Sequence, residues 1–223
     1  MTLCVDIVAL GNTQRTLLRG LRFEVPPGAV LTLMGPSGCG KSSVLAAIAG
    51  TLDSGAEDAE PLRLDGSIRL NGVDLGPVPT ARRGVGLLFQ DALLFPHLTV
   101  AENLLFAVPP GARASRRARV QQALQDAGLA GFGDRDPATL SGGQQARVAV
   151  MRALLAQPRA LLLDEPFSKL DTALRSQFRT FVFDHIRARS IPAVLVTHDR
   201  ADIADAARVL ELAGGEPYHA STR

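Results

Sequence analysis

The stretch "GPSGCGKSS", Gly35 to Ser43, decides which class of fold this chain adopts. It matches the pattern G-x-x-x-x-G-K-[S/T], with the apolar run "AVLTLM" before it and "SSVLAAIAG" after it. These flanks predict a buried strand and a helix, with Gly50 as the helix C-cap. Glycines let a loop wrap a phosphate with its N–H groups pointing inward, and the helix start adds partial positive charge. The sequence therefore predicts a site for a nucleoside triphosphate.

Side chains within this loop have separate predicted tasks. Lys41 would place its ammonium between the β- and γ-phosphates, and the Ser42 hydroxyl can ligate Mg²⁺. Cys39 has two interpretations, either a small filler residue or a thiol whose pKa is lowered by the helix start. The predicted nucleotide contacts are Gly35, Pro36, Ser37, Gly38, Cys39, Gly40, Lys41, Ser42 and Ser43.

The composition fits a globular chain with one large domain or one domain with a subdomain. Of its 223 residues 46% are hydrophobic, and the net charge of +2 demands neither nucleic acid nor a membrane surface. Two cysteines make no disulfide framework, which suits a reducing cytoplasm. The start "MTLCVDIVAL" has no basic n-region, and no apolar run approaches the ~18 residues of a membrane span. We expect neither a signal peptide nor a transmembrane helix.

The rest of the chain alternates predicted strands with predicted helices, which implies a parallel α/β sheet. Two short strands, Val5 to Leu10 and Leu21 to Val25, come first, and the acidic segment 53–66 is predicted to be a solvated loop. A strand with a hairpin turn is predicted in "SIRLNGVDL", and buried strands in "GVGLLF", "RALLLDEP" and "AVLVTHD". Helices are predicted from Val100 to before Pro109, over "ASRRARVQQALQDAG", and from Ser141 to before Pro158.

Polar side chains stand at the ends of three of these predicted strands. Gln90 ends the strand "GVGLLF", Asp164 and Glu165 end the strand in "RALLLDEP", and His198 ends the strand in "AVLVTHD". In an open α/β sheet such ends converge on the crevice that also holds the phosphate loop. Asp164 and Gln90 then suit Mg²⁺, Glu165 suits a base that orients the attacking water, and His198 suits a contact with the γ-phosphate.

Each of these polar residues also has a plainer interpretation. Asp164 and Glu165 could be a helix-start pair before Pro166. Gln90 could be polar surface, and His198 could be a hydrogen-bonded core residue.

A second glycine corner, "LSGGQQ", covers Leu140 to Gln145. Ser141 followed by Gly142 and Gly143 at a helix start forms another anion site, made of an N-cap hydroxyl and free N–H groups. An ordinary capped helix is one interpretation. The other is that this corner grips the γ-phosphate held by a different copy, which a two-fold dimer would do twice.

Taken together, these motifs resemble the ATP-binding cassette (ABC) ATPases across essentially the whole chain. The resemblance is carried, in order, by the phosphate loop, Gln90, "LSGGQQ", "LLLDEP", "SKLD" (Ser168 to Asp171) and His198. The stretches "FQDALLFPHLTVAENL" and "DEPFSKLD" are most similar to ATP-binding subunits of bacterial importers. The nearest resemblance is to a little-characterised subgroup related to importers for thiamine, iron or polyamines.

The resemblance implies a P-loop NTPase fold over residues 1–223. This fold has a mostly parallel sheet, a small N-terminal antiparallel β subdomain and an inserted helical subdomain at about 91–157. It also implies a head-to-tail homodimer that encloses two ATP molecules with Mg²⁺. Ser141, Gly142, Gly143 and Gln144 of one copy would face the ATP held by the other. Glu165 would be the catalytic base, His198 the switch histidine, and Ser168 and Asp171 part of the dimer loop.

The implied partners are integral membrane permease subunits and an extracytoplasmic substrate-binding protein, with no nucleic acid. The chain would act at the cytoplasmic face of the inner membrane. Leu93, Leu94 and Phe95 would belong to the groove that receives a cytoplasmic helix of the permease, although an apolar triplet could equally be core.

The sequence departs from the family pattern at two places. The family often stacks adenine on an aromatic residue upstream of the phosphate loop, and here that stretch is Ala9-Leu10-Gly11. Lys169 stands in the dimer loop, where the family often has a small residue. It is either a surface lysine or a contact with the partner subunit.

Two other functions compete with transport. A non-transport ABC ATPase acting on nucleic acid or the ribosome usually has a long coiled-coil insertion or two cassettes, and neither is visible in the sequence. A P-loop kinase or GTPase has no use for "LSGGQQ".

Overall fold

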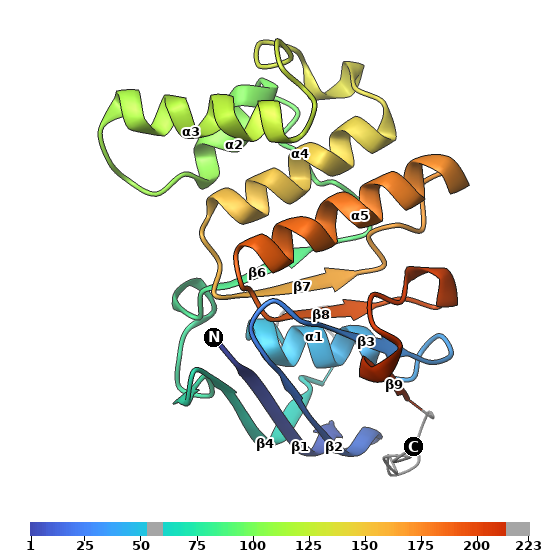
Figure 1. Ribbon diagram of the computed structural model, residues 1–223. Helices are drawn as coiled ribbons and strands as arrows, with labels where there is room; N and C mark the ends of the chain where they lie inside the picture. The colour runs from blue at the N-terminus through green and yellow to red at the C-terminus, as the bar shows by residue number, and fades with distance from the viewer. Residues whose placement is uncertain (53–59, 213–223) are drawn as a thin grey trace.

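The computed structural model describes residues 1–52 and 60–212, which form two sheets and the helices around them (Figure 1). The antiparallel sheet has the order β2-β1-β4-β5 and the parallel sheet the order β6-β7-β8-β3-β9. The antiparallel strands are β1 (Leu3–Gly11), β2 (Thr16–Val25), β4 (Arg63–Leu70) and β5 (Val73–Asp74). The parallel strands are β3 (Val30–Met34), β6 (Val85–Leu88), β7 (Ala160–Asp164), β8 (Ala193–Val196) and β9 (Val209–Glu211).

Helices cover both faces of the parallel sheet. The α-helices are α1 (Lys41–Ala49), α2 (Val100–Ala107), α3 (Arg113–Asp126), α4 (Gly142–Leu155) and α5 (Thr172–Ala188). Figure 1 shows α1 between the two sheets, α4 and α5 on the opposite face of the parallel sheet, and α2 and α3 beyond α4. Within the described residues, no helix is both long enough and apolar enough to cross a membrane.

Two hydrophobic cores follow from the alternation of side chains along the parallel strands. On β7, Leu161 and Leu163 pack with α4 and α5, whereas Ala160 and Leu162 pack with α1 and the antiparallel sheet. Strands buried on both faces are continuous apolar runs, which is why these stretches could be predicted.

The predicted fold class is confirmed, and so are the helix boundaries that capping residues indicate. Gly50 takes the left-handed conformation at the end of α1. Thr99 and Glu102 form a capping box at the start of α2, and α3 and α4 lie where the sequence predicted them. Helix α5 and strand β9 lie outside the elements predicted from the sequence.

The prediction of a loop over 53–66 is wrong at its end. Residues 53–59 lie outside the described residues, but Arg63 to Gly66 belong to β4 and pair with β1. Gly66, the last residue of the predicted loop, lies where the register between β1 and β4 shifts, and a Cβ there would be 2.1 Å from the Asp6 carbonyl oxygen. Pairing with β1 therefore outweighs the loop-like composition.

The side chain of Arg83 joins the loop before β6 to the end of α1. Its Nη1 donates to the carbonyl oxygens of Ala47 and Ile48 at 2.8 and 3.0 Å, and its Nε donates to Val78 at 2.9 Å. Burial lowers the pKa of Arg83. The guanidinium thus satisfies carbonyl groups that a helix end leaves without intrahelical partners.

We expect Arg83→Met to lower the free energy of unfolding by about 2–4 kcal/mol, because three carbonyl groups lose a charged donor. Urea unfolding followed by circular dichroism measures this. Arg82→Met, at the exposed neighbour, is the matched control and should change stability by less than about 0.5 kcal/mol. Equal stability of the two variants would contradict this role of Arg83.

Candidate active site

The phosphate loop connects the fully buried strand β3 to the start of α1. Gly35 has φ +145, and a Cβ there would be 2.5 Å from the carbonyl oxygen of Leu212. Gly40, the N-cap of α1, has φ +97 and offers no side-chain cap. The first N–H groups of α1 are thus not used by a capping side chain, in contrast to α2, α4 and α5. This arrangement fits an anion at the helix start.

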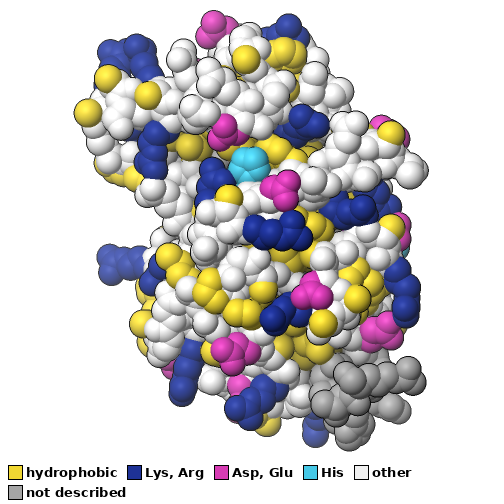
Figure 2. Space-filling model, in the orientation of Figure 1, with side chains coloured by type: hydrophobic (Ala, Val, Ile, Leu, Met, Phe, Trp, Pro, Cys, Tyr) yellow, Lys and Arg dark blue, Asp and Glu magenta, His cyan; other side chains and the backbone are white. Residues whose placement is uncertain are grey.

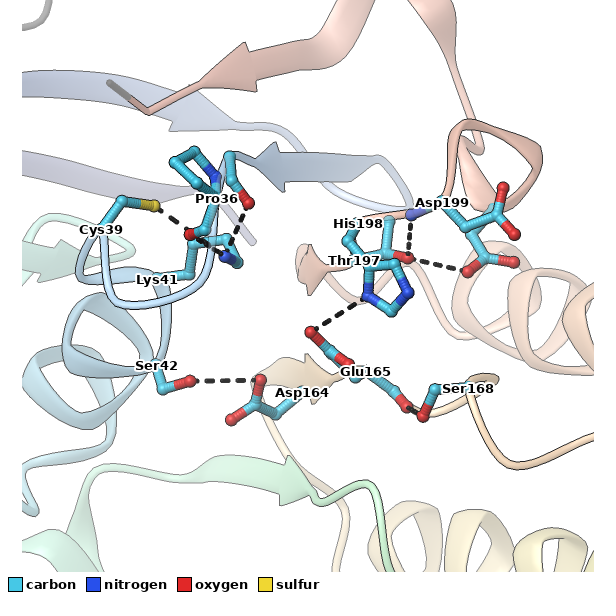
Figure 3. Close-up of polar contacts among 12 residues, drawn as sticks. Pro36, Cys39, Lys41, Ser42, Asp164, Glu165, Ser168, Thr197, His198 and Asp199 are labelled. Atoms are coloured by element: carbon cyan, nitrogen blue, oxygen red, sulfur yellow. Dashed lines mark hydrogen bonds and ion pairs between the residues drawn. The ribbon is translucent and has the colours of Figure 1, made fainter. Parts of the chain in front are cut away.

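Lys41 lies across the loop (Figure 3). Its Nζ donates to the carbonyl oxygens of Gly35 and Pro36, both at 2.8 Å, and lies 3.8 Å from the sulfur of Cys39. Cys39 itself is only 3% exposed. Its burial fits a packing role beneath the loop. A pocket of about 610 Å³ is lined by Leu17, Gly35, Pro36, Ser37, Gly38, Gly40, Lys41, Ser42, Ser43, Glu165 and His198.

Ser42 and Asp164 connect α1 to the end of β7. The hydroxyl of Ser42 donates to Oδ1 of Asp164 at 3.4 Å. Burial is the main cause that raises the pKa of Asp164, and the neighbouring Glu165 carboxylate adds to it. Gln90, two residues beyond β6, lines a second pocket together with Ser42, Asp164 and Glu165. These are oxygen ligands of the kind that Mg²⁺ prefers.

Glu165 and His198 approach each other from the ends of adjacent strands. Nδ1 of His198 lies 3.3 Å from Oε1 of Glu165 (Figure 3). Glu165 has φ +46, a conformation that is uncommon for residues other than glycine. Its N–H donates to the carbonyl of Val196 at 3.0 Å, which fixes this turn against β8. Backbone strain of this kind is concentrated at functional sites.

The second glycine corner lies elsewhere on the surface. Ser141 is the N-cap of α4, and it forms a capping box with Gln144. Gly142 is exposed, with nothing within 4 Å of a Cβ built on it, whereas a Cβ on Gly143 would be 2.2 Å from the Leu174 side chain. Ser141 to Gln144 line neither of the two pockets above. One copy of the chain therefore brings together the predicted strand-end residues but not this corner.

The segment after Glu165 folds back onto it before α5 begins. The hydroxyl of Ser168 donates to the Glu165 carbonyl at 2.9 Å, and Asp171 caps α5 by accepting from the Leu174 N–H at 3.0 Å. Lys169 forms an ion pair with Asp91, the neighbour of Gln90. The lysine thus contacts the Gln90 loop of its own chain.

No aromatic side chain occupies the predicted position of the adenine platform. Leu10 is fully buried in the core, and its neighbours are Ala9 and Gly11. Leu17 lines the phosphate-loop pocket instead. Sequence reasoning missed Leu17, because a leucine on a strand carries no signal that separates a pocket wall from core.

Comparison with known proteins identifies the family. The profile described as "ABC transporter" matches residues 18–168. The chain is 50% identical over 212 residues to the "Uncharacterized ABC transporter ATP-binding protein YnjD" of Escherichia coli K12, covering 95% of both chains. It is 43% identical to the "Fe(3+) ions import ATP-binding protein FbpC 3" of Rhodococcus jostii RHA1, covering 90% of this chain and 56% of that protein. The chain therefore spans about half the length of the latter relative.

A solved structure similar to this chain belongs to the same family. It is the dimeric, post-hydrolysis state of the ATP-binding cassette MJ0796 bound to ADP and Pi. The similarity has a TM-score of 0.75 at 26% identity and covers 94% of both chains. This chain belongs to the ABC transporter family, and it is an ATPase that binds and hydrolyses ATP.

The raised pKa of Asp164 makes a prediction about stability and pH. A carboxyl group whose pKa is higher in the folded state destabilises that state once pH exceeds its unfolded pKa. We therefore expect Asp164→Asn to have a higher Tm than the wild type at pH 7 without nucleotide or Mg²⁺. The gain should shrink as pH falls through about 4 and be nearly absent at about pH 3, where the carboxyl group is mostly protonated in both states.

Thermal unfolding between pH 3 and 8 measures this gain. Asp134→Asn, at an exposed carboxylate, is the control for replacing a carboxylate by an amide. A Tm of Asp164→Asn that falls below the wild-type value at pH 7 would contradict the inference that burial penalises the ionised group.

Proposed function

We propose that this chain is the ATP-binding subunit of a bacterial importer, and that a homodimer closed by two ATP molecules powers the membrane permease. The observation that carries the proposal is the split geometry of the site. The phosphate loop and the strand-end residues lie together, while Ser141 to Gln144 lie apart on the same chain. The dimeric similar structure and the relatives named as import proteins support it.

The phosphate loop from Gly35 to Ser43 would hold the triphosphate, with Lys41 exchanging its carbonyl partners for phosphate oxygens. Ser42, Gln90 and Asp164 would hold Mg²⁺, which would offset the negative charge of the triphosphate. In the described part of the chain, no three His, Cys, Asp or Glu side chains gather in a way that could hold a metal ion. This fits Mg²⁺, which is usually held by one or two carboxylates together with substrate phosphates.

Glu165 would act as the base that orients the attacking water, with Gln90 beside it. His198, 3.3 Å from Glu165, would contact the γ-phosphate and keep the carboxylate in place. Both side chains reach the phosphate-loop pocket, so they can act on one nucleotide.

The dimer would complete each site with the other copy's second glycine corner. Of Ser141, Gly142, Gly143 and Gln144, the first two are exposed at the start of α4, and a helix start can bind an anion. Ser168 and Asp171 would lie at the dimer contact, because their segment begins at Glu165.

The permease would dock beside Gln90, on the helical subdomain at about 91–157. Phe89, next to Gln90, is 48% exposed, and within this subdomain Leu93 is 57% and Phe106 70% exposed. Phe106 packs edge-on against Phe95 at 4.9 Å between ring centroids. Leu94 and Phe95 are partly buried, so Leu93 is the member of the predicted triplet most available to a partner. The chain would lie at the cytoplasmic face of the inner membrane, and an extracytoplasmic substrate-binding protein would deliver the cargo.

The competing function is a non-transport ATPase that acts on nucleic acid or the ribosome. Figure 2 shows Lys and Arg interspersed with Asp and Glu on the face in view, rather than one continuous basic surface. This distribution favours transport. Copurification from membranes discriminates the two, because an integral membrane partner supports transport and bound nucleic acid supports the alternative.

We expect Glu165→Gln to bind ATP but to hydrolyse it at least about a hundredfold more slowly, because it lacks the base. Its mass in solution should double with Mg-ATP. Light scattering coupled to size exclusion measures the mass, and Glu24→Gln at an exposed carboxylate of β2 is the control. A Glu165→Gln chain that binds ATP and stays monomeric at every concentration would undercut the dimer.

The missing aromatic platform predicts weak selection of the base. We expect the Kd values for ATP and GTP to agree within about tenfold, since in the described part of the chain Leu17 lines the pocket, and an apolar side chain offers no hydrogen bond that separates adenine from guanine. Equilibrium binding with fluorescent analogues of both nucleotides measures them. A preference for ATP above about a hundredfold would show that other residues select adenine.

A further inference from the structure

Arg175 lies in the first turn of α5, four residues after Asp171 of the dimer loop. Its backbone N–H donates to the Asp171 carbonyl at 2.8 Å. Its side chain reaches two carboxylates in the turn after His198. Nη1 contacts Asp199 at 2.8 Å, and Nε and Nη2 make a two-pronged contact with Asp202 at 2.9 and 2.5 Å. A two-pronged contact fixes orientation as well as distance.

These contacts continue into the residues that flank His198. The hydroxyl of Thr197 donates to Oδ2 of Asp202 at 2.8 Å and accepts from the N–H of Asp199 at 3.1 Å (Figure 3). Oδ1 of Asp199 accepts from the N–H of Ala201 at 2.9 Å. The residues before and after His198 are therefore both held, while the imidazole itself is free to face Glu165.

Burial distinguishes this network from a surface ion pair. The Asp202 side chain is 2% exposed and that of Arg175 is 19% exposed. The carboxylates of Asp202 and Asp199 raise the pKa of Arg175. Exposed ion pairs contribute little to stability. Removing one member of a buried pair leaves an unpaired buried charge, which is strongly destabilising. The ion pair between Arg187 and Asp184, also on α5, is exposed.

We propose that Arg175 is a positioning residue, which holds the turn that carries His198 to the start of α5 and so places the imidazole against Glu165 and the γ-phosphate. The inference rests on the role proposed above for His198. Because the Arg175 N–H also bonds the Asp171 carbonyl, the same residue would make the dimer loop and the histidine turn move as one body. Arrival of a second copy at Asp171 would then be transmitted to His198.

The test compares Arg175→Gln, Arg175→Lys and His198→Ala in single-turnover hydrolysis, with protein in excess over ATP. We expect Arg175→Gln to lower the hydrolysis rate by about tenfold or more while the Kd for ATP changes by less than about threefold, because positioning errors affect the reaction more than binding. Arg175→Lys should recover part of the rate. Arg187→Gln makes the same change on an exposed turn of α5 and should leave the rate unchanged.

The double variant Arg175→Gln with His198→Ala shows whether the arginine acts through the histidine. If it does, the double variant hydrolyses ATP no more slowly than His198→Ala alone, since residues that act as a unit are not additive. A further loss in the double variant would overturn the proposal. An unchanged rate in His198→Ala would instead contradict the role of His198. An unchanged rate in Arg175→Gln, with a lowered rate in His198→Ala, would contradict the role of Arg175 alone.

We call the contacts of Arg175 with Asp199 and Asp202 a clamp. Hydrogen exchange tests this clamp without relying on activity. Arg175→Gln should speed exchange of the amides of Asp199 and Ala201, and Arg187→Gln should not. Thr197→Val, which keeps the shape and removes the hydroxyl, should loosen the same amides if Arg175→Gln does not fold. If these amides exchange in Arg175→Gln at the wild-type rate, the proposal is overturned. If Arg175→Gln does not fold, the same result in Thr197→Val overturns it.

Discussion

The position of the candidate site residues depends on the parallel pairing of four strands, β3, β6, β7 and β8. Leu33 pairs with Val196, Leu163 with Leu195, and Leu88 with Leu163, so the strands end at one edge of the sheet. Each strand leads into one part of the site: the phosphate loop, Gln90, the Asp164–Glu165 pair or His198. Parallel strands need buried faces, and the two cores on either side of the sheet provide them. The site is therefore a consequence of packing, and a register slip in any of these strands would misplace its ligand.

This dependence explains why much of the fold and the strand-end cluster could be predicted from sequence. An apolar run predicts a buried strand, and the polar residue that ends it, Asp164, Gln90 or His198, is predicted at the same time to lie at the site. Capping residues such as Thr99, Ser141 and Gly50 mark helix ends through local hydrogen bonds, and local patterns predict them. The resemblance to a known family supplied the antiparallel and helical subdomains, which no single stretch indicates.

The features that sequence did not predict depend on partners distant in the chain. Gly66 was predicted as part of a loop because the strand that pairs with it, β1, lies more than fifty residues away in sequence. Arg175 and Asp202 become a clamp only when the end of β8 meets the start of α5. Lys169 and Asp91 likewise meet across the site. In each case the residue type is ordinary, and its role comes from what tertiary packing places beside it.

The central claim is that each site combines the phosphate loop of one copy with the second glycine corner of the other. Mixing two inactive variants tests it most directly. Lys41→Ala loses the phosphate grip, and Gly142→Asp puts a negative charge at the exposed corner where a Cβ meets nothing. A mixed dimer contains one site with Lys41 from one copy and Gly142 from the other. The account predicts that an equimolar mixture hydrolyses ATP faster than either variant alone. A mixture no faster than the variants, or full activity of Gly142→Asp by itself, would contradict it.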